Sequence, residues 1–132
     1  MRPCDALITG FVRSPLLLER SLAPLRRLRQ EGVLRAIHYV TWDSPDLDAC
    51  VAPLAQMADV ALTRVPQPQA QGNGIQRGIV YQMENLRAAL AQVPGGDGRI
   101  WKSRSDFVAG ADFLRAKISS FERHCAVPQR LS

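Results

Sequence analysis

Short continuous apolar runs alternate along the chain with longer stretches in which apolar residues recur every three or four positions. The runs lie at 6–11, 33–42 and 59–65, and a fourth begins at Ile100. Runs of this kind are typical of buried strands, whereas spacings of three and four indicate amphipathic helices. The pattern therefore predicts the order strand, helix, strand, helix, strand, helix, strand, helix.

Polar caps mark where the first three predicted helices begin. Ser-Pro pairs at 14–15 and 44–45 place a side-chain acceptor before a proline at the first helical position. Asn73, followed three residues later by Gln76, has the arrangement of a capping box. A fourth helix is predicted over 112–123. The predicted buried stripes are Leu18, Leu22, Leu25 and Leu28 in the first helix, Leu47, Val51, Leu54 and Ala58 in the second, and Ile75, Ile79, Met83, Leu86, Leu90 and Val93 in the third.

The alternation of strands and helices defines the expected fold class. It predicts an α/β domain with a mainly parallel open sheet of about four strands, helices on both faces and right-handed crossovers. No linker divides the sequence, so residues 1–124 are expected to form one domain and 125–132 a C-terminal tail. Ligands of open α/β sheets bind outside the carboxyl ends of the strands.

Composition and charge narrow the possible partners. The 132 residues are 46% hydrophobic and 22% charged, ordinary values for a globular chain, and no apolar run approaches the roughly 20 residues that span a bilayer. The N-terminus lacks a signal-peptide pattern, so we expect a cytoplasmic protein that is not transmembrane. A net charge of +5 suits an anionic ligand.

Nucleic acid is not the expected anion. Arg26, Arg27 and Arg29 stand near the end of the first predicted helix, where cations complement the helix dipole. Aromatic residues are few and do not interleave with the arginines as they do in platforms that stack single strands. Arginines on the solvated side of a helix end therefore explain much of the basic surplus better than a nucleic-acid patch does.

Several familiar chemistries lack the residues that they need. The sequence has no phosphate-loop motif, no three-glycine dinucleotide fingerprint and no Gly-x-Ser-x-Gly elbow. Its three cysteines and two histidines are too scattered for a zinc site, and the thiols are expected to be reduced. His38 lies mid-strand beside Tyr39 and is expected to be structural rather than catalytic.

The strand that begins at Ile100 carries a charge at every second position. Lys102, Arg104 and Asp106 share one face, because alternate residues of a strand point the same way. One interpretation is an edge strand with a solvated face. The other is a ligand site in which Asp106 holds a divalent cation while Lys102 and Arg104 neutralise a diphosphate. A sugar transferase with a nucleotide-activated donor requires the second arrangement.

Two motifs in the second half of the chain resemble those of a known family. The segment GNGIQRGIVYQ at 72–82 opens a predicted helix, and the strand WKSRSD follows at 101–106. They are similar to the Asn-x-x-Arg-Gln-like segment and the Lys-x-Arg-x-Asp strand of WavE-type lipopolysaccharide synthesis proteins, glycosyltransferases of the GT-A type. The strand and turn at 8–13 and Thr-Trp-Asp at 41–43 are similar as well. The resemblance covers about residues 5–115 and implies the Rossmann-like nucleotide-binding half of a GT-A fold, acting in bacterial surface polysaccharide synthesis.

The resemblance implies residues that bind the nucleotide after the first two strands. Gly10 and Arg13 would lie beside the nucleotide, and Trp42 or Asp43 would lie near its base or ribose. Trp42 has an alternative role as a packing residue at a strand end, and Arg13 as an ordinary surface cation.

The start of the third helix would face the phosphates or sugar of the donor. By resemblance, Asn73, Gln76 and Arg77 contribute here, at a helix N-terminus that already favours anions. Asn73 and Gln76 have the alternative role of capping the helix. Arg77 is harder to explain without a ligand, because a cation in the first turn of a helix is electrostatically disfavoured.

The resemblance also implies a metal and two substrates. Asp106 would correspond to the last acid of an Asp-x-Asp motif that holds Mn²⁺ or Mg²⁺, but Arg104 occupies the first position, which leaves metal dependence open. The implied partners are a nucleotide-sugar donor and a glycan or lipid-linked acceptor. Little chain follows Asp106, so the sequence fits a donor-binding half or a reduced relative. A non-catalytic α/β module that binds a nucleotide or a partner is the alternative, and it needs neither metal nor Asp106.

Overall fold

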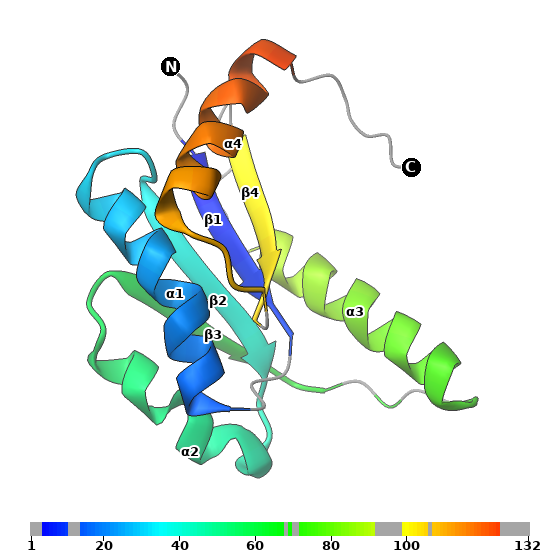
Figure 1. The fold of residues 1–132 in the computed structure, drawn as a ribbon. Coiled ribbons are helices and arrows are strands. Elements are labelled where there is room, and N and C mark those ends of the chain that lie inside the picture. The colour runs from blue at the N-terminus through cyan, green and yellow to red at the C-terminus, as the bar shows by residue number, and fades with distance from the viewer. Residues whose placement is uncertain are drawn as a thin grey trace.

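The computed structural model describes residues 4–10, 14–67, 69, 72–91, 99–105 and 107–124. Strands and helices follow one another in the predicted order (Figure 1). The strands are β1 (Cys4–Thr9), β2 (Ala36–Trp42), β3 (Val60–Val65) and β4 (Arg99–Arg104). The helices are α1 (Pro15–Gln30), α2 (Asp48–Val51) between the 3-10 turns η1 (Pro45–Leu47) and η2 (Ala52–Gln56), α3 (Gly74–Leu90) and α4 (Ala111–His124).

The four strands form one parallel sheet in the order β3-β2-β1-β4. β1 lies inside the sheet and pairs with β2 on one side and β4 on the other, so that Leu7 stands between His38 and Lys102. Parallel strands bring all their carboxyl ends to the same edge of the sheet. The predicted α/β fold with an open parallel sheet and helices on both faces is confirmed.

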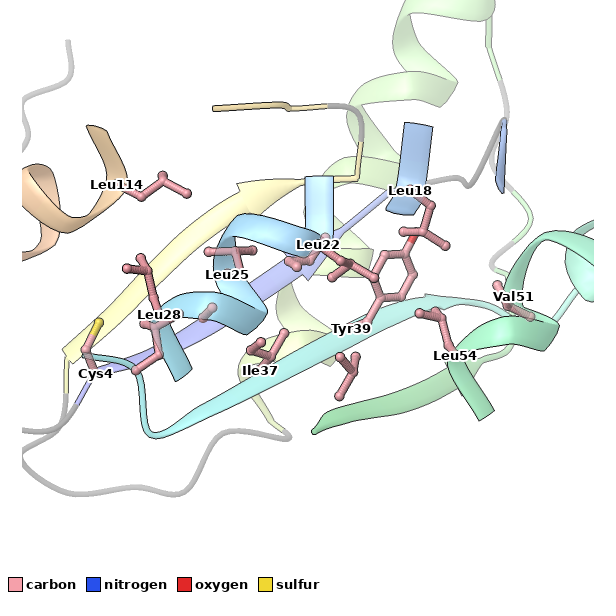
Figure 2. Packing of buried hydrophobic residues seen from close by; sticks show 14 of the residues in the cluster. Cys4, Leu18, Leu22, Leu25, Leu28, Ile37, Tyr39, Val51, Leu54 and Leu114 are labelled. Carbon is pink, nitrogen blue, oxygen red and sulfur yellow. The ribbon is translucent and has the colours of Figure 1, made fainter. Parts of the chain in front are cut away.

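α1 and α4 cover one face of the sheet, and the four leucines predicted for α1 are buried there (Figure 2). These leucines pack with Ile37 and Tyr39 of β2, and Leu114 and Ile118 bring α4 into the same core. Ser14 caps α1, because its Oγ accepts a first-turn N–H at 3.3 Å. α1 therefore begins and packs as its apolar spacing predicts.

The second predicted helix is shorter and less regular than expected. Residues 45–56 form η1, α2 and η2 in succession instead of one α-helix. Pro53 contributes to this, because a proline inside a helix has no N–H to donate to the preceding turn. Leu47, Val51 and Leu54 are buried as predicted, but Ala58 is exposed because η2 ends at Gln56 and Ala58 lies in the turn before β3.

α3 covers the opposite face with a different side from the one that its apolar spacing predicts. Its buried residues are Asn85 and Ala89, and Ala89 packs against Leu7 and Val40 of the sheet. The predicted stripe is largely solvent-exposed: Ile75 77%, Ile79 54%, Met83 67% and Leu90 47%, with Leu86 half-buried and Val93 outside the described residues. In Figure 1 the first half of α3 extends beyond the sheet.

The sheet face beneath α3 explains why this stripe points outward. Strand alternation places Thr9, Lys102 and Arg104 on the same face as Leu7. The apolar patch around Leu7 and Val40 suits the small side chain of Ala89, but it gives a row of large apolar side chains little to bury against. The predicted buried stripe of α3 is therefore wrong, although the helix itself is where the spacing predicts it.

Asp5 carries a buried charge near the start of β1. Its carboxylate accepts hydrogen bonds from Arg35 Nε at 2.9 Å and Nη2 at 3.1 Å, and lies 3.1 Å from His38 Nε2. Burial raises the pKa of Asp5, but the hydrogen bonds from Arg35 and His38 outweigh burial and hold the pKa below its ordinary value. His38, expected to be structural, thus has a buried partner in the sheet.

Asp5→Asn is expected to lower the free energy of unfolding by about 1.5 to 3 kcal/mol near neutral pH, the range for a hydrogen bond to a charged group. The folded-state pKa of Asp5 is lowered, so its contribution is complete above the unfolded-state pKa of about 3.9 and is lost as pH falls through the lower folded-state value. Urea denaturation of both proteins between about pH 7 and about pH 2 measures this effect. The difference between them should shrink below about pH 4, and a difference independent of pH would contradict this role for Asp5.

The described thiols are reduced, as the sequence predicts. Cys4 and Cys50 are free, with Cys4 buried and Cys50 half-buried, and burial raises the pKa of the Cys4 thiol. The predicted tail at 125–132 lies outside the described residues. Among the helices within the described ranges, none combines the length and the apolarity needed to cross a bilayer.

Candidate functional site

A cleft of about 560 Å³ lies between the carboxyl ends of β1, β2 and β4 and the part of α3 from Gly74 to Leu86. This edge of a parallel sheet is where open α/β folds bind their ligands. Five of the predicted binding residues line it, namely Gly10, Trp42, Arg77, Lys102 and Arg104. The other lining residues are Thr9, Gly74, Gly78, Tyr81, Gln82, Met83, Asn85, Leu86 and Ser105. The fold thus brings together residues that are distant in the sequence.

Gly10, directly after β1, connects the elements around the cleft. Its N–H donates to Asn85 Oδ1 of α3 at 2.9 Å. Its carbonyl oxygen accepts from Thr41 Oγ1 at 2.9 Å and from the Tyr39 hydroxyl at 3.3 Å, both on β2. Its φ of +119° favours glycine, and a Cβ at this position would lie 3.0 Å from Ser105 Oγ. Backbone conformation and close approach therefore both require glycine here.

Three basic side chains line the cleft. Lys102 and Arg104 are exposed on the side of β4 that faces α3, while Ser103 between them is buried on the other side. Arg77 comes from the first turn of α3, and within the described ranges its side chain makes no hydrogen bond or ion pair. β4 is an edge strand, as the alternative interpretation of its charges predicts. Its two cations nevertheless line a cleft.

An aromatic pair forms another part of the cleft lining. The rings of Trp42 and Tyr81 meet edge to face, with centroids 6.1 Å apart and planes at 64°. Trp42 is buried at the end of β2, so it packs in the core as well as bordering the cleft. Tyr81 is half-buried on α3. The cleft therefore combines an aromatic pair with a basic cluster.

Asn85 lines the cleft from α3 and is only 2% exposed. Its Oδ1 accepts from Gly10, but its Nδ2 is buried and has no hydrogen-bond partner among the residues that the structure describes. Buried donors without a partner are uncommon in proteins, and each calls for an explanation. Asn85 is the most unusual polar group of the site.

The sequence interpretation missed Asn85 and Ser105. One signal was present for Asn85: Gly74, Gly78, Asn85 and Ala89 are small or polar and recur at helical spacing, which marks a helix face able to approach a sheet closely. The apolar stripe of the same helix is the stronger pattern, so it was predicted to be the buried face instead. No local sequence pattern identified Ser105, because its importance comes from its proximity to Gly10 at the end of the neighbouring strand.

The side chains of Asn73 and Gln76 cap the start of α3. Asn73 Oδ1 accepts from the Gln76 N–H at 2.9 Å, and Gln76 Oε1 accepts from the Asn73 N–H at 2.9 Å. The predicted capping box is confirmed. Neither side chain lines the cleft, so their predicted contact with a donor stays a prediction.

Of the three remaining predicted residues, only Asp43 is described, and it does not line the cleft. Asp43 is exposed beyond the end of β2, where its carboxylate lies 3.6 Å from Arg64 Nε. Arg64 also binds Asp48 at 2.8 Å, which ties β3 to α2. Arg13 and the predicted metal ligand Asp106 lie outside the described residues.

The described lining of the cleft leaves the predicted divalent cation a prediction, because its proposed ligand Asp106 lies outside the described residues. None of the described lining residues is Asp or Glu, and in the described part of the chain no three His, Cys, Asp or Glu side chains gather as metal ligands. Mg²⁺ and similar hard cations bind through oxygen ligands, most often carboxylates. Amide donors and basic groups instead suit an anion.

No family model, curated protein or solved structure matches this chain. The fold and the cleft alone define its class: a parallel α/β domain with a cationic cleft at the carboxyl edge of its sheet. Function must therefore be argued from the chemistry of that cleft.

Gly10→Ala is expected to lower the free energy of unfolding by about 1 to 3 kcal/mol, because alanine is strained at this φ and its Cβ would press on Ser105 Oγ. Gly32→Ala is the matched control, since Gly32 also has a positive φ but nothing within 4 Å of a Cβ. In a Ser105→Ala background the cost of Gly10→Ala should fall. Urea denaturation measures all these variants, and equal costs at positions 10 and 32, unchanged by Ser105→Ala, would contradict the close contact.

Proposed function

We propose that this chain is a cytoplasmic, nucleotide-sugar-dependent glycosyltransferase of the GT-A type, or its donor-binding half, that acts in bacterial surface polysaccharide synthesis. One observation carries the proposal: Arg77, Lys102 and Arg104 line the same cleft as Gly10 at the carboxyl edge of a parallel sheet. A nucleoside diphosphate is the ligand of such enzymes whose charge matches three cations.

The cations would bind the diphosphate in complementary ways. The planar guanidinium groups of Arg77 and Arg104 present paired donors to phosphate oxygens, and Lys102 adds a compact charge. A bound phosphate would also offset the unfavourable position of Arg77 in the first turn of α3. During transfer of the sugar to a glycan or lipid-linked acceptor, the same groups would stabilise the charge that develops on the departing diphosphate.

A second function, binding without catalysis, is favoured by a different observation. Among the described residues that line the cleft there is no carboxylate and no histidine. An inverting transfer needs a general base within hydrogen-bond reach of the acceptor hydroxyl. A nucleotide-binding module without turnover is therefore the alternative that the cleft supports.

Calorimetric titration with uridine and guanosine diphosphates and their sugar conjugates tests donor binding. Lys102→Ala and Arg104→Ala should each weaken the binding of a diphosphate by roughly 10-fold or more, as expected for the loss of a charged hydrogen bond. Lys117→Ala is the matched control and should leave affinity within about twofold, because the only other lysine of the chain lies exposed on α4, over the Phe113 ring.

Two additions to this experiment separate the alternatives. Titrations with Mn²⁺ and with EDTA show whether binding needs a metal, and metal-dependent binding that is lost in Asp106→Ala would assign the cation to that residue. Release of nucleoside diphosphate in the presence of glycan acceptors reports turnover. Binding without release identifies the non-catalytic module, whereas no binding of any nucleotide or nucleotide sugar overturns the proposed function.

A further inference from the structure

The orientation of the Asn85 amide is fixed by the protein. The backbone N–H of Gly10 can only donate, so the atom 2.9 Å from it must be the amide oxygen of Asn85. The amide NH₂ group therefore faces away from Gly10. Asn85 lines the cleft, and its Nδ2 finds no acceptor among the residues described by the structure.

The NH₂ group of Asn85, unlike its amide oxygen, holds no other element of the described structure in place. The hydrogen bond to Gly10 needs only the amide oxygen, so the NH₂ group takes no part in it. A buried donor that lacks a partner destabilises the protein that contains it. A ligand that supplies the missing acceptor would explain why an amide stands at this position.

The surroundings of Asn85 indicate the charge of that acceptor. Arg77, Lys102 and Arg104 line the same cleft, and no described lining residue carries a negative charge. In such a positive, partly enclosed site an anionic oxygen is favoured over a neutral one. The required group is therefore a phosphate or carboxylate oxygen.

We infer that Asn85 is a ligand-binding residue whose Nδ2 donates to an anionic oxygen held at the exit of β1, in the cleft that Lys102 and Arg104 also line. This inference deepens the proposed function and rests on it for identifying the anion as the diphosphate of a donor. The contact itself requires only an anion of phosphate or carboxylate chemistry. Asn85 and the hydrogen-bonded turn at Gly10 form one unit, so the amide is held in place before the anion arrives.

A second buried donor also lacks a partner within the described ranges, but it lies away from the cleft. Trp101 Nε1 is also unpaired among the described residues. Trp101 pairs in register with Ala6, which belongs to the core beneath α1, so its side chain lies on the face opposite to Leu7 and α3. Trp101 does not line the cleft, whereas Asn85 does.

Asn85→Asp tests the inference with little change in shape. The aspartate keeps an acceptor for the Gly10 N–H, removes the NH₂ donor and places a negative charge where we expect the anion. Calorimetry with inorganic pyrophosphate, in EDTA, should show affinity reduced at least about tenfold. Gln56→Glu is the matched control: the same amide-to-acid change on η2, away from the cleft, should alter affinity less than about twofold.

Nuclear magnetic resonance of the unmodified protein provides a measurement that does not depend on folding of the variant. The side-chain NH₂ signals of Asn85, assigned through their correlations with the backbone signals of the unmodified protein, should shift when pyrophosphate is added. The NH₂ signals of Gln30 and Gln56, which lie outside the cleft, should stay in place. Citrate in place of pyrophosphate distinguishes a carboxylate ligand from a phosphate ligand.

The outcomes separate this inference from the proposed function. Pyrophosphate or citrate binding that shifts the Asn85 amide and weakens in Asn85→Asp supports the anion contact, even where every nucleotide sugar fails to bind and the proposed function falls. Binding that leaves the Asn85 amide unmoved and tolerates Asn85→Asp overturns the inference, even where a nucleotide sugar binds. Failure of the unmodified protein to bind pyrophosphate, phosphate or citrate overturns it as well.

Discussion

The backbone of Gly10 is the constraint on which the rest of this structure depends. Its N–H holds α3 through Asn85, and its carbonyl oxygen holds β2 through Thr41 and Tyr39. The missing side chain leaves room for Ser105 at the end of β4. One turn after β1 thus joins the three elements that enclose the cleft, and a change there alters the fold and the site together.

The anchor at Gly10 also decides which side of α3 faces the sheet. Apolar spacing favours the stripe that begins at Ile75, yet the helix buries Asn85 and Ala89 instead. Hydrophobic burial rewards a stripe only where the opposing surface is apolar, and here that surface is limited to the region around Leu7 and Val40. The part-buried hydrogen bond between Gly10 and Asn85 favours this orientation, because breaking it would leave the buried Asn85 oxygen unsatisfied.

Local patterns were sufficient for the elements and their order, since caps, breaks and spacings act over a few residues. The Ser14 cap, the Asn73 capping box and the α1 leucines were all predictable for this reason. The position of Lys102 and Arg104 in the same cleft as Gly10 was also predictable, because parallel strands place their carboxyl ends at one edge of the sheet. The role of Asn85 was not, because it depends on a contact 75 residues away in sequence that no local pattern encodes.

The charges of β4 show why the two interpretations of that strand are compatible. An edge strand benefits from charged residues, which discourage pairing with other chains. That requirement accounts for exposed cations at Lys102 and Arg104, but it would be met equally by acidic residues or by charges of both signs. It does not explain why Arg77, on a separate helix, adds a third cation to the same cleft. Three basic side chains from two separate elements at one cleft would suit an anionic ligand, which edge protection alone does not require.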